Sequence, residues 1–184
     1  LAAALIPGKS VIKYASANYQ VQDVCLFLQA LGVQIEGIGT SVMTVHGVKE
    51  INTNISYSPS EDPIESMFFI AAAIMTNSSI IIRRSPLDFL ELELLKLEHM
   101  GFKYKILSEY KAANGHTRLG DIQTFPSKLT ALEEKIHANV YPGLNMDNLP
   151  FFALIATQAK GETLIHDWSY EKRAVYYKEL DKLG

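Results

Sequence analysis

One carboxylate in this sequence stands at the start of an expected apolar helix, within the segment YPGLNMDNLPFFALIA of residues 141–156. A Pro-Gly turn comes before Asp147, and Asn148, Leu149 and Pro150 follow it. An Asp in this place can cap the helix, a contact worth about 0.5–2 kcal/mol. A carboxylate at a helix start can also orient a substrate hydroxyl or accept its proton. The residues alone leave both roles open, and the two roles are compatible.

Other residue types that could carry chemistry give weaker signals. The single cysteine, Cys25, lies on an expected apolar helix stripe, where a small thiol more often packs than attacks. The five histidines show no spacing typical of metal ligands, so no metal site is expected. Gly37 and Gly39 lack the third glycine and the helix of a dinucleotide fingerprint. Arg83 and Arg84 are neighbours on an expected strand, so we expect at most one of them to face a site.

Composition narrows the class of protein. The chain has 184 residues, 48% of them hydrophobic, which is enough for one domain or two small ones. The formal net charge is -3, and Lys and Arg are scattered, so neither nucleic acid nor an anionic membrane is an expected partner. The longest apolar run, Met67–Met75, is far shorter than the roughly 20 residues of a spanning helix. One cysteine cannot form an internal disulfide, which favours the cytoplasm.

Three segments of the chain repeat one pattern: residues 1–32, 71–101 and 154–184. Each predicts an apolar helix, a tight turn, a short strand, a second, amphipathic helix and a closing glycine. The turn residues are Gly8, Asn77 and Gly161, and the spacing from turn to closing glycine is 24, 24 and 23 residues. This near-constant spacing indicates a repeated structural unit.

Strands are expected after the closing glycines. Residues 33–48 alternate in character and predict a β-hairpin. Residues 102–125 predict a second hairpin that turns at Asn114-Gly115. The third unit has no such hairpin after it and the first unit starts on a helix, so we expect the chain to be a segment of a longer protein.

The ends of the second helices carry their own signals. In the middle unit, Ser85 is expected to cap the helix and Pro86 to occupy its first position. The closing glycines 32, 101 and 184 suit the left-handed residue that ends such helices. The stretch SYSPSEDPIES of residues 56–66, with two prolines and acidic residues, favours a crossing between domains near residue 60.

Four strings carry a family resemblance: IEGIGTSVMTVHGV, DPIESMFFIAAA, YPGLNMD, and GETLIHDWSYEKRAVYYKELDKLG. They resemble, in order, the Gly-x-Gly-Thr hairpin, the Asp-x-Ile-Glu segment with its Ala-rich helix, the Tyr-Pro-Gly-Phe-Pro-Thr-Asp string, and the Glu-Asn-Arg turn with its helix in the enolpyruvyl transferase family. The branch of the family that acts on UDP-N-acetylglucosamine is the most similar. The resemblance runs over essentially the whole chain and covers less than half of the family's usual length.

The resemblance implies an α/β fold, α+β in the wider sense, built from helix-strand-helix-hairpin units. In the family these units form inside-out α/β barrels, which would be incomplete in this chain. Residues 1–60 would be the last repeat unit of one domain. Residues 61–184 would be two repeat units of the second domain, the last of them truncated.

The resemblance also implies an activity. The family moves an enolpyruvyl group from phosphoenolpyruvate to an acceptor hydroxyl by addition and elimination, with no metal or cofactor. In this branch the acceptor is the 3'-hydroxyl of UDP-N-acetylglucosamine, and the reaction belongs to cytoplasmic peptidoglycan precursor synthesis, hence to cell-wall biogenesis and cell shape. By position, Asp147 falls on the aspartate that meets the attacking hydroxyl and is the expected catalytic residue. Asp147, Ser169, which lies beside the nucleotide sugar, and Arg173 of the Glu-Asn-Arg turn are the expected substrate-binding residues.

The chain departs from the family near these positions. Asn145 and Met146 replace Pro and Thr, Leu149 replaces Gln, and Lys172 replaces Asn. A non-catalytic paralogue or binding module on the same scaffold is therefore a second hypothesis. A relative that acts on 3-phosphoshikimate is a third, although the Tyr-Pro-Gly string argues against it. We expect the isolated segment to be inactive, because positioning needs both walls of the cleft, and its unpaired strand edges would allow a homo-oligomer.

Overall fold

The computed structural model describes residues 1–183, whose contacts form two compact units. The first unit is Leu1–Ser60 with the loop Ala113–Gly115, and the second is Glu61–Ala112 with the chain from His116 onward. That these units are the last repeat of one domain (residues 1–60) and two repeats of another (residues 61–184) stays a prediction.

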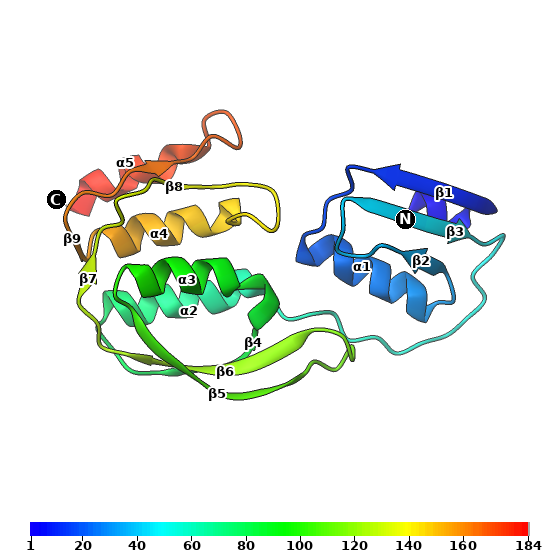
Figure 1. Cartoon of the computed structure of the whole chain (residues 1–184), viewed down its shortest axis with the longest axis horizontal. Helices are drawn as coiled ribbons and strands as arrows, with labels where there is room; N and C mark the ends of the chain where they lie inside the picture. Colours follow the sequence, from blue (N-terminus) through cyan, green and yellow to red (C-terminus); the bar gives the residue numbers. More distant parts are fainter. Residues whose placement is uncertain (184) are drawn as a thin grey trace. The chain divides into compact units, whose positions relative to one another are not determined.

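The first unit is a three-stranded antiparallel sheet with one helix packed against it (Figure 1). Its sheet order is β1-β3-β2. Its elements are η1 (Ala2–Leu5), β1 (Gly8–Lys13), α1 (Tyr19–Ala30), β2 (Gln34–Glu36) and β3 (Val42–Gly47). The hairpin expected within residues 33–48 is confirmed by β2 and β3. The apolar helix expected at the start of the chain is only the short 3-10 turn η1.

The core of the first unit lies between α1 and the sheet. Asn18 caps α1, since its side chain accepts a hydrogen bond from the backbone N–H of Val21 at 3.1 Å. Cys25 on α1 is buried, and its Sγ lies 3.3 Å from Sδ of Met43 on β3. Burial raises the pKa of the Cys25 thiol. The thiol is therefore a packing group rather than a nucleophile.

The second unit holds the longer helices and sheet. Its helices are α2 (Pro63–Met75), η2 (Leu87–Phe89), α3 (Glu91–His99), η3 (Met146–Asn148), α4 (Leu149–Ala156), η4 (Arg173–Val175), α5 (Tyr176–Leu180) and η5 (Asp181–Leu183). Its strands are β4 (Ile81–Pro86), β5 (Lys103–Lys111), β6 (Arg118–Phe125), β7 (Leu129–Thr130), β8 (Ile136–His137), β9 (Ala159–Lys160) and β10 (Ile165–His166). The first three strands form an antiparallel sheet in the order β4-β6-β5, and β7 with β9 and β8 with β10 form short parallel pairs.

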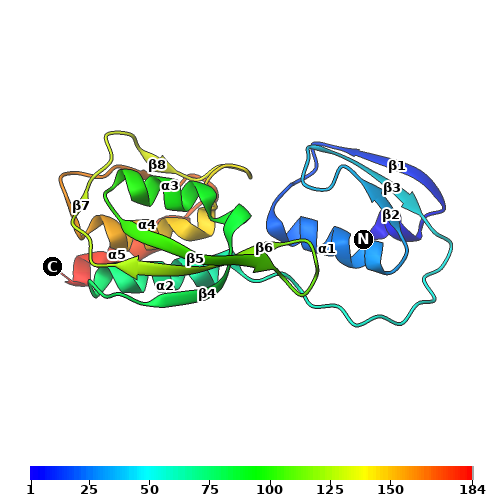
Figure 2. The ribbon, with the colours of Figure 1, turned by 60° about the horizontal axis from the view of Figure 1, so that its bottom comes forward.

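Helices cover one face of the β4-β6-β5 sheet. α2 contacts both β4 and β6 and also α4, so it lies between the sheet and α4 (Figures 1 and 2). Asp62 caps α2 by accepting from the N–H of Ile64 at 2.8 Å, and Pro63 stands at the first helical position. Fully buried side chains from both of these helices, such as Ile70 and Phe152, fill one continuous core with residues of α3 and β6. This core fixes the start of α4, which directly follows the turn that contains Asp147.

Several local predictions are confirmed. The hairpin expected within residues 102–125 is β5 with β6, and Gly115 in its turn has a φ of +76°. Gly32 and Gly101 are left-handed, with φ of +94° and +98°. Gly184, the third closing glycine, lies outside the described residues. The expected start of the middle helix is wrong: Ser85 and Pro86 end β4, paired with β6, and α3 begins only at Glu91.

A bulge in β4 changes the direction of one arginine. The register of β4 against β6 shifts between Ile82 and Ser85, and Arg84 in the bulge has a φ of +60°. Its N–H donates to Oδ1 of Asp121 at 3.1 Å. Strand alternation is lost, so Arg83 and Arg84 are both exposed and line the same cavity. The premise that their side chains point to opposite faces is therefore wrong, while the expectation that at most one of them is functional stays a prediction.

The fold class is α/β, as the sequence predicts. Helices and strands are mixed, the sheets are small, and within residues 1–183 none of them closes into a barrel. Measured against the length and hydropathy that a bilayer-spanning helix requires, every helix in residues 1–183 falls short.

Candidate functional site

Asp147 stands in a polar turn that leads into α4. Asn145 caps the start of this turn, because its Oδ1 accepts a hydrogen bond from the N–H of Asp147 at 3.0 Å. α4 then begins at Leu149 with no side-chain cap. The carboxylate of Asp147 therefore does not cap the helix, and the capping role considered for it from the sequence is wrong.

The carboxylate of Asp147 meets Arg173 instead. Nη2 of Arg173 donates to Oδ1 of Asp147 at 2.9 Å and to the carbonyl oxygen of Met146 at 2.8 Å. The side chain of Asp147 is 47% exposed, and that of Arg173 is 21% exposed. Within residues 1–183, the second oxygen of Asp147, Oδ2, makes no hydrogen bond. Two of the three expected site residues are thus in contact, and one carboxylate oxygen is open to a further donor.

A second aspartate, which sequence reasoning missed, completes the environment of Arg173. Nε of Arg173 donates to Oδ2 of Asp167 at 3.1 Å, and the side chain of Asp167 is 0% exposed. The hydroxyl of Tyr176 donates to the same oxygen at 3.0 Å. Partial burial lowers the pKa of the Arg173 guanidinium, but the two carboxylates raise it by more, so the net shift of the pKa is upward. Arg173 is therefore a fixed cation between a buried and a half-exposed carboxylate.

Aromatic side chains flank this cluster. Burial raises the pKa of Tyr176, and its hydrogen bonds with Tyr177 and Asp167 act in the same direction, so its hydroxyl stays a donor. Nε1 of Trp168 donates to the carbonyl oxygen of Ala138 at 3.0 Å. The Trp168 contact joins the segment after β10, which contains Asp167, to the segment that contains Ala138.

Ser169 is not joined to the cluster by a hydrogen bond. It lies in the bend between β10 and η4 and is half-buried. In the described part of the chain its hydroxyl has no partner. Its expected place beside a nucleotide sugar stays a prediction.

Lys172 affects the site through its backbone conformation. It has a φ of +58°, directly before Arg173. This left-handed conformation is strained for Lys and easier for Asn, the residue that the resemblance places at this position. The tight turn sends the Arg173 side chain toward both aspartates.

The turn that carries Asp147 is held from inside the core. Oε1 of Glu93 on α3 accepts from Nδ2 of Asn148 at 2.8 Å and from the N–H of Asn145 at 3.4 Å. Glu93 and Asn148 are both buried, with 4% and 0% of their surface exposed. Burial raises the pKa of Glu93, although its hydrogen bonds oppose that shift.

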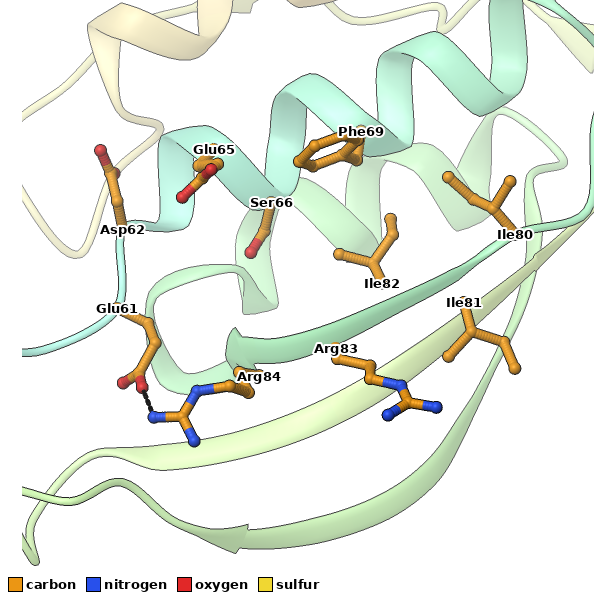
Figure 3. Close-up of a pocket in the computed structure, with 10 residues that line it drawn as sticks. All are labelled: Glu61, Asp62, Glu65, Ser66, Phe69, Ile80, Ile81, Ile82, Arg83 and Arg84. Atoms are coloured by element: carbon orange, nitrogen blue, oxygen red, sulfur yellow. Dashed lines mark hydrogen bonds and ion pairs between the residues drawn. The ribbon is translucent and has the colours of Figure 1, made fainter.

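A separate cavity of about 360 Å³ lies between α2 and β4 (Figure 3). An ion pair between Glu61 and Arg84 closes one end, while Ser66 and Phe69 from α2 face Ile82 of β4. A more open, largely apolar hollow of about 410 Å³ lies between α4 and α5. Asp147 lines neither of them, and with 47% of its side chain exposed its carboxylate lies on the surface of the unit.

The Asp147–Arg173 arrangement suits a polar acceptor better than a metal. A free, half-exposed carboxylate oxygen can accept a hydrogen bond from a hydroxyl, and the adjacent guanidinium is a donor for oxygen-rich ligands. No cluster of three or more His, Cys, Asp or Glu within the described residues is placed to hold a metal ion.

Comparison with known proteins gives a family match over the whole chain. The model of the family described as EPSP synthase (3-phosphoshikimate 1-carboxyvinyltransferase) matches residues 1–184. The curated UDP-N-acetylglucosamine 1-carboxyvinyltransferases of Sulfurimonas denitrificans and Coprothermobacter proteolyticus are 32% and 31% identical to it. These alignments cover 100% of this chain and only 41% and 40% of those proteins. The chain therefore spans about two fifths of the length of these relatives.

Solved structures share the fold. The chain is similar to the enolpyruvyl transferase NikO from Streptomyces tendae, with a TM-score of 0.79 and 23% identity over 98% of this chain and 40% of that one. It is also similar to EPSP synthase from Acinetobacter baumannii, with a TM-score of 0.63 and 20% identity over 89% of this chain and 36% of that one. The predicted α/β fold of an incomplete enolpyruvyl transferase is confirmed.

Proposed function

This chain belongs to the EPSP synthase family of enolpyruvyl transferases, and from that premise we propose that it is the part of such an enzyme that presents Asp147 to an acceptor hydroxyl. The donor is phosphoenolpyruvate and the acceptor is the 3'-hydroxyl of UDP-N-acetylglucosamine. The reaction serves peptidoglycan precursor synthesis in the cytoplasm. Asp147 is the catalytic residue, and Arg173 and Ser169 bind substrate.

The observation that carries the proposal is the state of the Asp147 carboxylate. Arg173 fixes one oxygen at 2.9 Å, and the side chain remains 47% exposed with its other oxygen free of partners in the described chain. Such an exposed pair adds little to the stability of the fold, because half-exposed ion pairs contribute at most about 1 kcal/mol. The geometry instead suits a group held ready for a ligand.

In the addition step the sugar oxygen bonds to C2 of phosphoenolpyruvate and loses its proton, while the double bond breaks and C3 gains a proton. Elimination then releases inorganic phosphate from C2 and a proton from C3, which restores the double bond. The free Oδ2 of Asp147 accepts the hydrogen bond of that hydroxyl and so directs its oxygen at the donor. Proton acceptance by a positioned carboxylate typically contributes about 10²–10⁴-fold in rate. Arg173 keeps the carboxylate in one orientation and adds a positive charge beside the anionic substrates.

The acceptor is the finer part of the proposal. Relatives at 28–32% identity that are named for UDP-N-acetylglucosamine support that sugar nucleotide. A 3-phosphoshikimate acceptor is the second candidate, favoured by the description of the family model and by the similarity to EPSP synthase structures. A non-catalytic binding module is the third, favoured by Met146 and Leu149.

One experiment separates the three. The full-length gene product that contains this chain is titrated by calorimetry with UDP-N-acetylglucosamine and with 3-phosphoshikimate, and phosphate release from phosphoenolpyruvate is followed with each. We expect saturable heat with UDP-N-acetylglucosamine and none with 3-phosphoshikimate. Phosphate release from phosphoenolpyruvate should occur only when UDP-N-acetylglucosamine is the acceptor. Turnover with 3-phosphoshikimate alone would transfer the assignment to the second candidate. No phosphate release from phosphoenolpyruvate with either acceptor, whether or not the acceptor binds, would support the non-catalytic module.

Two further properties belong to the proposal. The 184-residue chain by itself should release no phosphate, since it spans about two fifths of its relatives and catalysis by positioning needs the remaining wall of the site.

The outer edge of β5 has no strand partner within the described residues and would allow a homo-oligomer of the isolated chain. Sedimentation at several concentrations tests this, because a monomer at every concentration would remove it.

A further inference from the structure

Glu93 is an unusual residue for the core of the second unit. It lies on α3 with only 4% of its surface exposed. In the part of the chain that the structure describes, no Lys, Arg or His pairs with its carboxylate. A buried carboxyl group without a cation is costly, and an aliphatic side chain of similar volume would stabilise the core more. Because the core would be more stable without Glu93, we looked to its hydrogen bonds for its role.

Both of its hydrogen bonds to other residues go to the turn that carries Asp147. Oε1 accepts from Nδ2 of Asn148 at 2.8 Å and from the backbone N–H of Asn145 at 3.4 Å. These two residues flank Asp147 closely, one on each side. Asn145 in turn accepts the N–H of Asp147 at 3.0 Å. A continuous path of hydrogen bonds thus leads from the buried Glu93 to the backbone of Asp147.

Asn148 adds a second sign that the contact is specific. It is 0% exposed, and its Oδ1 has no hydrogen-bond partner within residues 1–183. A buried amide oxygen without a donor is costly. The amide nitrogen of the same side chain donates to Oε1 of Glu93 at 2.8 Å. Asn148 is therefore buried for its contact with Glu93, although its own Oδ1 is left without a donor.

We propose that Glu93 is a positioning residue for Asp147, an inference that rests on the proposed function. By anchoring Asn145 and Asn148 from the core, it sets the turn so that the Asp147 carboxylate reaches Arg173 and keeps its other oxygen outward. Glu93 touches no substrate. Its effect on the reaction passes entirely through the turn.

The first test measures the turn without using activity. Amide hydrogen exchange at Asp147 is followed by NMR in the 184-residue chain. Glu93→Leu keeps the volume and removes the acceptor, so the amide of Asp147 should exchange about 10-fold faster, as expected for the loss of roughly one net hydrogen bond. Glu93→Gln keeps an acceptor oxygen for both contacts, so exchange should stay within about twofold of the natural chain. Glu133→Leu, at an exposed position of the same unit, is the control and should change nothing.

The outcomes separate cleanly. Unchanged exchange in Glu93→Leu, or equal losses in the Leu and Gln variants, would overturn the inference. If Glu93→Leu does not fold, Asn148→Leu takes its place, since it removes the shorter of the two contacts. An increase of about 3-fold is expected there, and no increase counts against the inference.

The second test connects the turn to the reaction. In the full-length protein, Glu93→Leu should lower kcat with UDP-N-acetylglucosamine by about 10- to 100-fold, the scale of a misplacement near 1 Å. KM for phosphoenolpyruvate should stay nearly constant, and Glu93→Gln should restore kcat. If Asp147→Asn leaves turnover unchanged while exchange still responds to Glu93→Leu, the proposed function fails and the anchoring of the turn stands. If Asp147→Asn abolishes turnover and Glu93→Leu has full kcat, the positioning role fails alone.

Discussion

The two aspartates on Arg173 should separate stability from turnover. The side chain of Asp167 is 0% exposed and that of Asp147 is 47% exposed. Removing one charge from a buried pair costs about 3–5 kcal/mol, whereas a half-exposed pair is worth at most about 1 kcal/mol. Because Arg173 itself keeps some contact with water, we expect Asp167→Asn to lower the free energy of unfolding by about 3 kcal/mol. Asp147→Asn keeps an acceptor for Arg173 and should lower it by less than about 1 kcal/mol.

Turnover should follow the opposite order. Asp147→Asn removes the proton acceptor, so kcat of the full-length protein should fall by about 10²–10⁴-fold while the fold stays intact. Asp167→Asn leaves that group in place. Its loss of kcat should be smaller and should diminish at low temperature, where more of the variant is folded.

Urea denaturation of the 184-residue chain measures the stability arm. Trp168 is the only tryptophan, and its Nε1 binds the carbonyl of Ala138, so its fluorescence reports on the unit that carries both aspartates. With a slope of about 1–3 kcal/mol per molar urea, a loss of 3 kcal/mol shifts the midpoint by about 1–3 M. A midpoint for Asp147→Asn as low as that of Asp167→Asn would show that Asp147 is structural and would refute the reasoning. Unchanged turnover in Asp147→Asn would refute it equally.

Three smaller predictions follow from burial and backbone conformation. Burial raises the folded-state pKa of Glu93 above its ordinary 4.5, so its favourable contribution is complete below about pH 4.5 and is lost as pH rises through the folded pKa. Urea midpoints across pH 4–8 should therefore show Glu93→Gln gaining stability relative to the natural chain as pH rises, and a constant difference would contradict the burial. Lys172 has a φ of +58°, so Lys172→Asn should raise the free energy of unfolding by about 0.5–1 kcal/mol, whereas the control Lys178→Asn in α5 should lower it; a loss in both would contradict the strain. The Cys25 thiol is buried against Met43, so a thiol reagent should label it only as urea unfolds the chain, and fast labelling of the folded chain would contradict its packing role.

Local signals in the sequence predicted the hairpins and the left-handed glycines. Asn114-Gly115 and Gly32 each need a backbone conformation that few other residues adopt easily, so their meaning survives folding. Ser85-Pro86 is the contrasting case. Its local signal is that of a helix start, but Ser85 and Pro86 pair with Gly120 and Leu119 of β6. Tertiary pairing overrode the local preference, and that pairing could not be seen from the residues near Ser85.

The candidate site was predicted only in part, and the missed residues share one cause. The resemblance named Asp147 and Arg173, which the fold brings together across 26 positions of sequence. Asp167 and Glu93 were missed because acidic residues are normally assigned to the surface. A signal for Glu93 was present: it stands with Leu90, Leu94 and Leu97 at the i, i+3, i+4 and i+7 positions of the buried stripe of α3. Asp167 left no comparable signal, since its burial depends on the packing of the chain after β10.

Met146 and Leu149, which favour a non-catalytic paralogue, bear differently on the site once their packing is known. Leu149 is 0% exposed in the core of the second unit, and Met146 is partly buried against the same core. Neither position offers its side chain to a ligand beside Asp147, so the missing amide and hydroxyl would not leave unpaired groups in the site. The polar contacts of this turn come instead from Asn145 and Asn148, which bind Glu93. The departures therefore change how the Asp147 turn is held and leave its carboxylate available, so the paralogue hypothesis now depends on turnover alone.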